Sequence, residues 1–154
     1  MAIADLLRTT AVNLLLERPG RKIALSDWAQ KLSKSGAAID QRAAKTKTPS
    51  AGDTLRHITS IERWGQRRLQ VALGEPLLTD ESDDYVLAPE PDLAKAREIF
   101  RTTRQATVAL VQKLAAAHVD PQLTIPHNQF GPLTIGGWLS YLNTHASLES
   151  QRIR

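Results

Sequence analysis

The stretch that decides the fold is residues 134–149, TIGGWLSYLNTHASLE, close to the end of the chain. Its large apolar side chains occur at positions i, i+3, i+4 and i+7: Ile135, Trp138, Leu139 and Leu142. This spacing places them on one face of an α-helix, and threonine is favoured at the N-cap that precedes a helix. We therefore predict a helix that starts near Thr134, runs to the end of the chain and buries one apolar face.

Four upstream segments show the same helical spacing, at about residues 3–15, 25–45, 50–74 and 92–117. Expected breaks and caps separate these segments: Pro19-Gly20, a cap at Ser26 or Asp27, closure over Lys45 to Pro49, a cap at Ser50, and Gly74 with Pro76. Two loops remain, an acidic one at 77–91 and one at 118–133. No segment alternates like a strand, so we expect no sheet.

These patterns predict an all-α fold, a four-helix bundle with an additional N-terminal helix. We divide the chain into residues 1–24, an accessory helix and linker, and residues 25–154, the bundle. The pattern leaves open which of the first two helices enters the core. Tryptophans 28, 64 and 138 all fall on apolar faces, so we expect them to fill that core.

The composition of the chain excludes several kinds of site and partner. The 154 residues suit one domain and include no cysteine, which excludes disulfides, thiolate zinc sites and a cysteine nucleophile. The net charge of +4 is dispersed and lacks interleaved aromatic residues, so we expect no nucleic-acid partner. No apolar run approaches the roughly 20 residues that cross a bilayer. Asp5 and Arg8 interrupt the apolar start, so we expect no secretory signal, no membrane partner and a cytoplasmic location.

The last helix also carries a candidate metal site. His145 and Glu149 are four residues apart and therefore share a helix face, which continues the apolar face. His57 lies in line with Ile61 and Trp64 on the 50–74 helix, so it faces the same interior. Two imidazoles and a carboxylate suit a divalent first-row ion and leave coordination positions open. The alternative is an ordinary i, i+4 pair at a solvated edge, with His57 far away.

The two other histidines and Tyr141 are not expected to bind the metal. We expect His118 and His127 to lie in surface loops and Tyr141 to pack in the core. The alternative places Tyr141, one turn before His145, and His127, from the adjoining loop, near the metal pocket, and we name no catalytic base.

Two stretches resemble DinB-like proteins, of the DinB/YfiT-like superfamily of metalloenzymes. Residues 127–149, HNQFGPLTIGGWLSYLNTHASLE, look like that family's last loop and histidine helix, and residues 52–64, GDTLRHITSIERW, like its histidine-bearing second core helix. The resemblance implies a four-helix bundle that binds a divalent metal, commonly nickel or zinc, through three histidines. His57 and His145 match two of them, and Glu149 stands where the third is expected. This departure keeps a ligand but changes its charge and softness.

The resemblance further implies a divalent-metal-dependent enzyme that acts on a small molecule as a transferase, isomerase or hydrolase, since the family's characterised members include thiol-dependent transferases and isomerases. We also expect a homodimer. The alternative is a non-catalytic helical bundle with a degenerate metal site, which dimerises or binds a partner. Nothing in the residues selects a reaction or a substrate.

Overall fold

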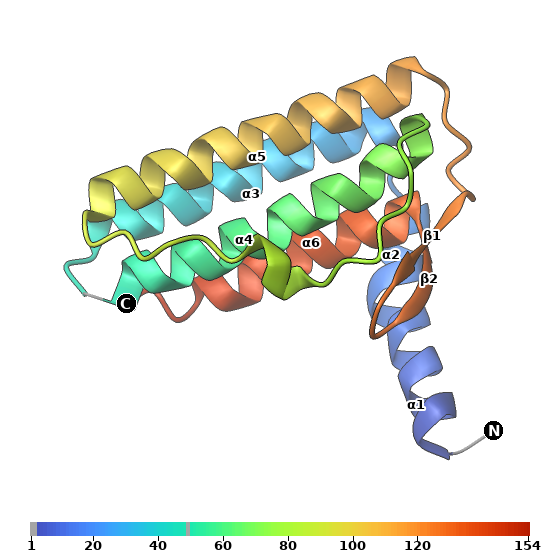
Figure 1. Cartoon of the computed structure of the whole chain (residues 1–154), viewed down its shortest axis with the longest axis horizontal. Coiled ribbons are helices and arrows are strands. Elements are labelled where there is room, and N and C mark those ends of the chain that lie inside the picture. The colour runs from blue at the N-terminus through green and yellow to red at the C-terminus, as the bar shows by residue number, and fades with distance from the viewer. Residues whose placement is uncertain (1–2, 49) are drawn as a thin grey trace.

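Four long helices pack side by side to form the body of the protein. The computed structural model describes residues 3–48 and 50–154. The helices are α3 (Leu25–Lys45), α4 (Ser50–Gln70), α5 (Leu93–Ala116) and α6 (Ile135–Ser150). In Figure 1 they run along the long axis of the molecule, with α3 and α5 above α4 and α6. The predicted all-α bundle is confirmed, and α3 is the early helix that enters its core.

An N-terminal helical segment projects from one end of the bundle (Figure 1). It comprises α1 (Ile3–Val12), the π-helical turn η1 (Asn13–Glu17) and the short helix α2 (Arg18–Arg21). The predicted break at Pro19-Gly20 is wrong, because the chain stays helical through both residues. Pro19 is the second residue of α2, which follows the π-helical turn η1 without a break. The division of the chain at residue 24 stays a prediction.

Gly20 has a packing role instead of ending a helix. A Cβ atom at Gly20 would lie 2.4 Å from the carbonyl carbon of Gly136 in α6. The adjacent turn is tied to the same place, because the buried carboxylate of Glu17 accepts both the N–H (2.9 Å) and the hydroxyl (2.7 Å) of Thr134. The N-terminal segment therefore seats directly on the start of α6.

The helix ends follow the expected chemistry in part. Thr134 caps α6 by accepting the N–H of Gly137 at 3.0 Å, as predicted, but α6 ends at Ser150. The expected cap of α3 is wrong, because Ala24 precedes that helix and provides no side-chain acceptor. Helix α4 begins at Ser50 itself, and Pro49 lies outside the described residues. Gly74, with φ of 99°, ends the short helix η2 (Val71–Leu73) that follows α4.

The expectation of no sheet is also wrong. Strands β1 (Thr124–His127) and β2 (Gly131–Thr134) form an antiparallel hairpin in which Thr124 pairs with Thr134 and His127 with Gly131. Each strand has four residues and contains a proline, and prolines weaken a strand signal. The three-residue turn is made possible by Gly131, whose φ of 77° is in the left-handed region. The hairpin leads straight into α6.

The core lies between the four helices. Tryptophans 28, 64 and 138 are all buried, which confirms their predicted place. A polar cluster also crosses this interior: Arg104 forms an ion pair with Glu62 at 2.9 Å, and Thr107 donates to the same carboxylate at 2.6 Å. Within the described residues, no helix has the length and apolar character that a bilayer span requires.

Candidate metal centre

The candidate site lies where α4 and α6 run antiparallel. Gly65 of α4 faces Leu142 of α6 so closely that a Cβ atom at Gly65 would lie 2.5 Å from a Leu142 methyl carbon. A glycine at this point lets the two helices approach closely. One turn further along α6, in the direction that runs back toward the start of α4, His145 meets His57.

The three predicted residues converge. The Nε2 atoms of His57 and His145 lie 3.2 Å apart, with ring centroids 5.0 Å apart. Together with a Glu149 carboxylate oxygen, the ligand atoms all lie within 4.8 Å of one another. Two nitrogens about 2.1 Å from one ion would be about 3.0–3.4 Å apart for bond angles between 90° and tetrahedral. The separation of the two imidazole nitrogens thus fits a shared ion. The Glu149 carboxylate would have to move closer to the two nitrogens to bind the same ion.

The charge states also suit ligands. Burial, with the neighbouring His57 adding to it, lowers the pKa of His145 to about 4, so this imidazole is neutral near pH 7. A neutral imidazole offers the lone pair that a metal requires. Glu149 forms an ion pair with the exposed Arg152 at 2.9 Å through Oε2. A carboxylate has a second oxygen, so this pair leaves an acceptor for a cation.

The site is open on one side. His57 is exposed, whereas His145 and Glu149 are partly buried. In the absence of an ion, the two imidazoles can share one hydrogen bond, since a neutral ring has both a donor and an acceptor nitrogen. An open position facing solvent is what distinguishes a metal site that can accept another molecule from a closed structural one.

His127 is not in a surface loop, so that expectation is wrong. It occupies β1, is 4% exposed, and its Nδ1 accepts the N–H groups of Gln129 (3.2 Å) and Phe130 (3.3 Å). Its ring lies 4.7 Å from Tyr141, which in turn lies 5.9 Å from His145. Burial, with Arg68 adding to it, lowers the pKa of His127 to about 4. Burial alternates along Thr124–His127, but this alternation exists only in the folded hairpin, and no signal in the sequence places His127 in the interior.

Tyr141 packs with this aromatic cluster, as predicted, and burial raises its pKa to about 12. His118 is exposed in the loop after α5, also as predicted. The aromatic cluster therefore adjoins the candidate site through Tyr141, on one side of His145.

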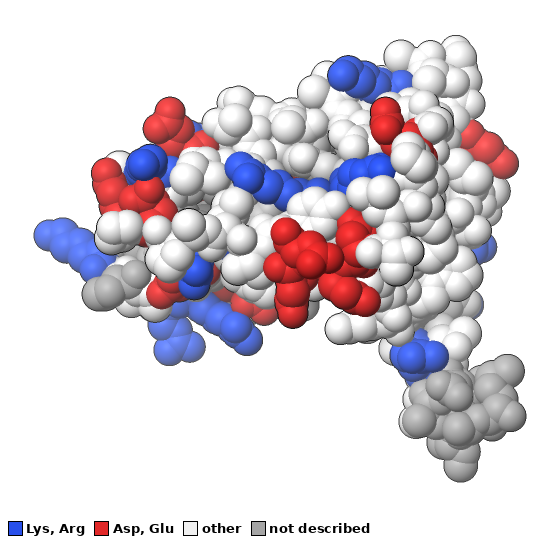
Figure 2. All heavy atoms as spheres, in the orientation of Figure 1, with Lys and Arg blue, Asp and Glu red and all other residues white. Residues whose placement is uncertain are grey.

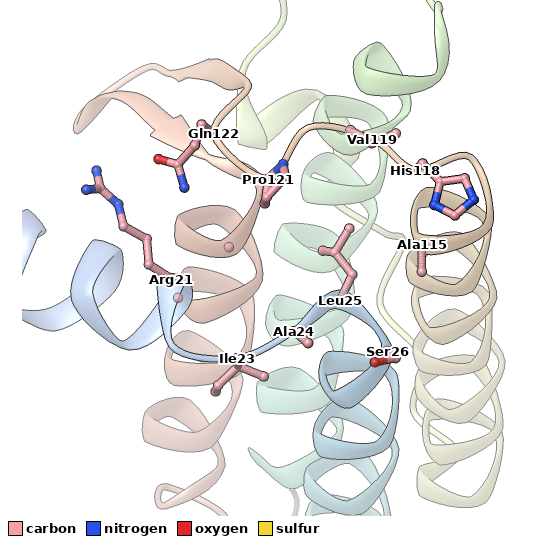
Figure 3. A pocket seen from close by; sticks show the side chains of 12 residues that line it. Arg21, Ile23, Ala24, Leu25, Ser26, Ala115, His118, Val119, Pro121 and Gln122 are labelled. Carbon is pink, nitrogen blue, oxygen red and sulfur yellow. The ribbon is translucent and has the colours of Figure 1, made fainter.

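A separate pocket lies elsewhere and has different chemistry. Figure 3 shows this pocket, of about 690 Å³, between the α2–α3 connection and the loop that leads to β1. Apolar side chains such as Ile23, Leu25 and Val119 line much of it, and Arg21 at its edge already pairs with Glu17 at 3.3 Å. No carboxylate is among its described lining residues. It therefore lacks the mixed ligand set of the α4–α6 site.

Sequence comparison agrees with the architecture. A model of the DinB superfamily matches residues 2–148. The chain belongs to the DinB superfamily. The DinB match includes His57 and His145 and ends one residue before Glu149, so it leaves the third ligand position to be judged from geometry. Comparison with curated proteins and with solved structures finds no match for this chain.

Proposed function

We propose that His57, His145 and Glu149 bind a divalent metal ion, and that the protein is a metal-dependent enzyme of the DinB type. The observation that carries this proposal is the convergence of three ligand atoms, from two helices, within 4.8 Å. Membership of the DinB superfamily, which is often metal-binding, supports the proposal independently of that geometry.

The donor set favours zinc or nickel. Imidazole nitrogen suits both ions, and a single carboxylate adds one negative charge without the oxygen-rich shell that calcium or magnesium prefers. A divalent ion held there would act as a Lewis acid or lower the pKa of a bound water or thiol. The chain contributes the neutral imidazole of His145, an exposed approach past His57, and an arginine, Arg152, that pairs with Glu149. These features accommodate a transferase, an isomerase or a hydrolase acting on a small molecule.

The test is metal binding by purified protein. Protein stripped with a chelator is titrated with Zn²⁺ or Ni²⁺ in a calorimeter, and protein purified without added metal is analysed for its elements. We expect one ion per chain, and His145→Ala should abolish binding while the helical circular dichroism is kept. His118→Asn is the matched control, because it removes an exposed histidine and asparagine tolerates the positive φ at that position.

The alternative, a non-catalytic bundle with a degenerate site, makes a different prediction. In that case His57 and His145 form only a hydrogen-bonded pair, and His145→Ala leaves metal binding unchanged. Stoichiometric binding that survives both His57→Ala and His145→Ala would remove the basis of the enzyme proposal.

A further inference from the structure

Helix α4 presents four arginines, and three of them hold the long loop between α4 and α5. Arg56 donates to the carbonyl oxygen of Leu87 at 3.3 Å, and Arg67 donates to that of Pro76. Arg68 donates to the carbonyls of Leu78 (3.2 Å) and Asp80 (2.8 Å) and forms an ion pair with the Asp80 carboxylate. These three arginines therefore have a structural role, since they fasten residues 76–87 against the bundle.

Arg63 differs from the other three. It lies between them in the sequence, yet within the described residues it donates no hydrogen bond to a loop carbonyl; its Nε donates to the Thr103 hydroxyl at 3.3 Å. Within residues 3–48 and 50–154 it forms no ion pair, and its two terminal nitrogens have no hydrogen-bond partner. A guanidinium presents a planar fork of donors that matches an oxyanion in two parallel hydrogen bonds. The fold thus anchors Arg63 through Nε, while its two terminal nitrogens have no partner within the described residues.

Arg63 lines a pocket of about 280 Å³ between α4 and α5, beneath residues 87–90. Arg56 and Lys95 line the same pocket, and Glu90 is the one acidic residue among its described lining. The negative charge of Glu90 is offset by an ion pair with Lys95 at 3.1 Å. Arg56 forms an ion pair with Asp53, whose side chain is 69% exposed. The pocket therefore has a positive balance that is greatest at Arg63. Figure 2 shows basic side chains crossing the middle of this face, next to an acidic cluster.

Apart from Thr59, whose hydroxyl donates to the carbonyl of Leu55 at 2.7 Å, the remaining walls are apolar. Leu87, Ala96 and Ile99 line the pocket beside the charged groups. A bare inorganic anion would meet the guanidinium but gain nothing from these walls, whereas a carboxylate on a short apolar body would contact both. The available volume limits that body to a small ring or a short chain.

We propose that the α4–α5 pocket binds a small carboxylate with an apolar body, whose oxygens are bound by the terminal nitrogens of Arg63. This site is distinct from the candidate metal centre, because Arg63 contacts α5 whereas His57 contacts α6. It needs no metal ion, so the two proposals fail or succeed separately.

The test uses benzoate and inorganic phosphate as probes, with chelator-treated protein, and follows backbone amide signals by nuclear magnetic resonance. Benzoate should shift the signals of Leu87 and Ile99 saturably, with a Kd of about 1 mM or tighter. Arg63→Gln should raise the Kd for benzoate at least about tenfold, which is the effect of losing a charge-assisted hydrogen bond. Arg18→Gln, which removes an exposed arginine of α2, should leave the Kd within about twofold and is the matched control.

Two further measurements keep the result interpretable. Arg63→Lys keeps the charge but loses the fork, so its Kd should lie between those of the wild type and Arg63→Gln, and the urea unfolding midpoint checks that each variant is folded. Equal benzoate affinity in the wild type and Arg63→Gln would overturn the proposal, as would a lack of saturable shifts in the wild type. Phosphate binding as tight as benzoate binding would overturn the assignment to an apolar carboxylate.

Discussion

Replacing Arg104 by methionine is expected to lower the free energy of unfolding by about 3–5 kcal/mol, the usual cost of leaving one buried charge without its partner. Arg104 is 3% exposed and Glu62 2% exposed, and their ion pair of 2.9 Å spans α4 and α5. Methionine keeps the apolar stem of Arg104, which passes over Gly36 of α3, but it removes the charge. The Glu62 carboxylate would then keep Thr107 as its hydrogen-bond partner, at 2.6 Å.

The loss should depend on pH. Burial raises the pKa of Glu62, and Arg104 opposes that rise, so the variant should raise this pKa further. A group whose pKa is higher in the folded state stabilises the fold most at low pH, and this stabilisation is lost as pH rises through the folded pKa. Arg104→Met should therefore be more destabilised at pH 8 than at pH 5. Urea unfolding followed at 222 nm measures both values.

Two comparisons test the reasoning. Glu62→Leu combined with Arg104→Met removes both charges, so the double variant should recover at least about 2 kcal/mol relative to the sum of the single changes. Lys95→Met removes a cation from the exposed pair with Glu90 and should cost less than about 1 kcal/mol. If Arg104→Met costs no more than Lys95→Met, the buried pair does not have the energetic role inferred from its burial.

Three further predictions concern the site and its supports. Glu149→His should give a three-histidine set and lower the Kd for Ni²⁺ and Zn²⁺ in calorimetric titration, because these ions favour imidazole, and an unchanged Kd would place Glu149 outside the site. Because the pKa of His127 is lowered to about 4 from an ordinary value of 6.5, the stability it confers is present above pH 6.5 and lost as pH falls toward 4. Urea unfolding should record a loss of at most about 1.4 kcal/mol per pH unit from this group, and His127→Gln should make the decline shallower. Gly136→Ala should destabilise by about 1–3 kcal/mol in thermal or urea unfolding, because its Cβ would lie 2.5 Å from the Gly20 carbonyl oxygen. Gly52→Ala, whose Cβ would meet nothing closer than 3.4 Å, should be neutral or stabilising, and equal losses in the two variants would argue against the close contact.

The candidate site was predictable because its parts are encoded locally. Helical spacing shows that His145 and Glu149 share a face, and that His57 shares the apolar side of its own helix. Each of these inferences needs only residues within two turns of one another. That His57 and His145 then lie 3.2 Å apart depends on the approach of α4 to α6 at Gly65, which no local pattern reports.

His127 shows the opposite case. Its neighbours Asn128 and Gly131 indicate a turn, and a turn suggests exposure. Its burial results from Trp64 and Tyr141, residues from two distant helices that close over the hairpin. Sequence spacing could not assign those contacts to a four-residue strand containing a proline.

The sequence by itself determined the long helices, their buried faces, the cap at Thr134 and the candidate ligand residues, because these depend on the 3.6-residue period and on local side-chain chemistry. Only the tertiary structure decided which segments meet. It seats Gly20 on Gly136, joins Glu62 to Arg104 and places Arg63 against Thr103 of α5. Such contacts join residues tens of positions apart, and their energies depend on distances that exist only once the helices have packed.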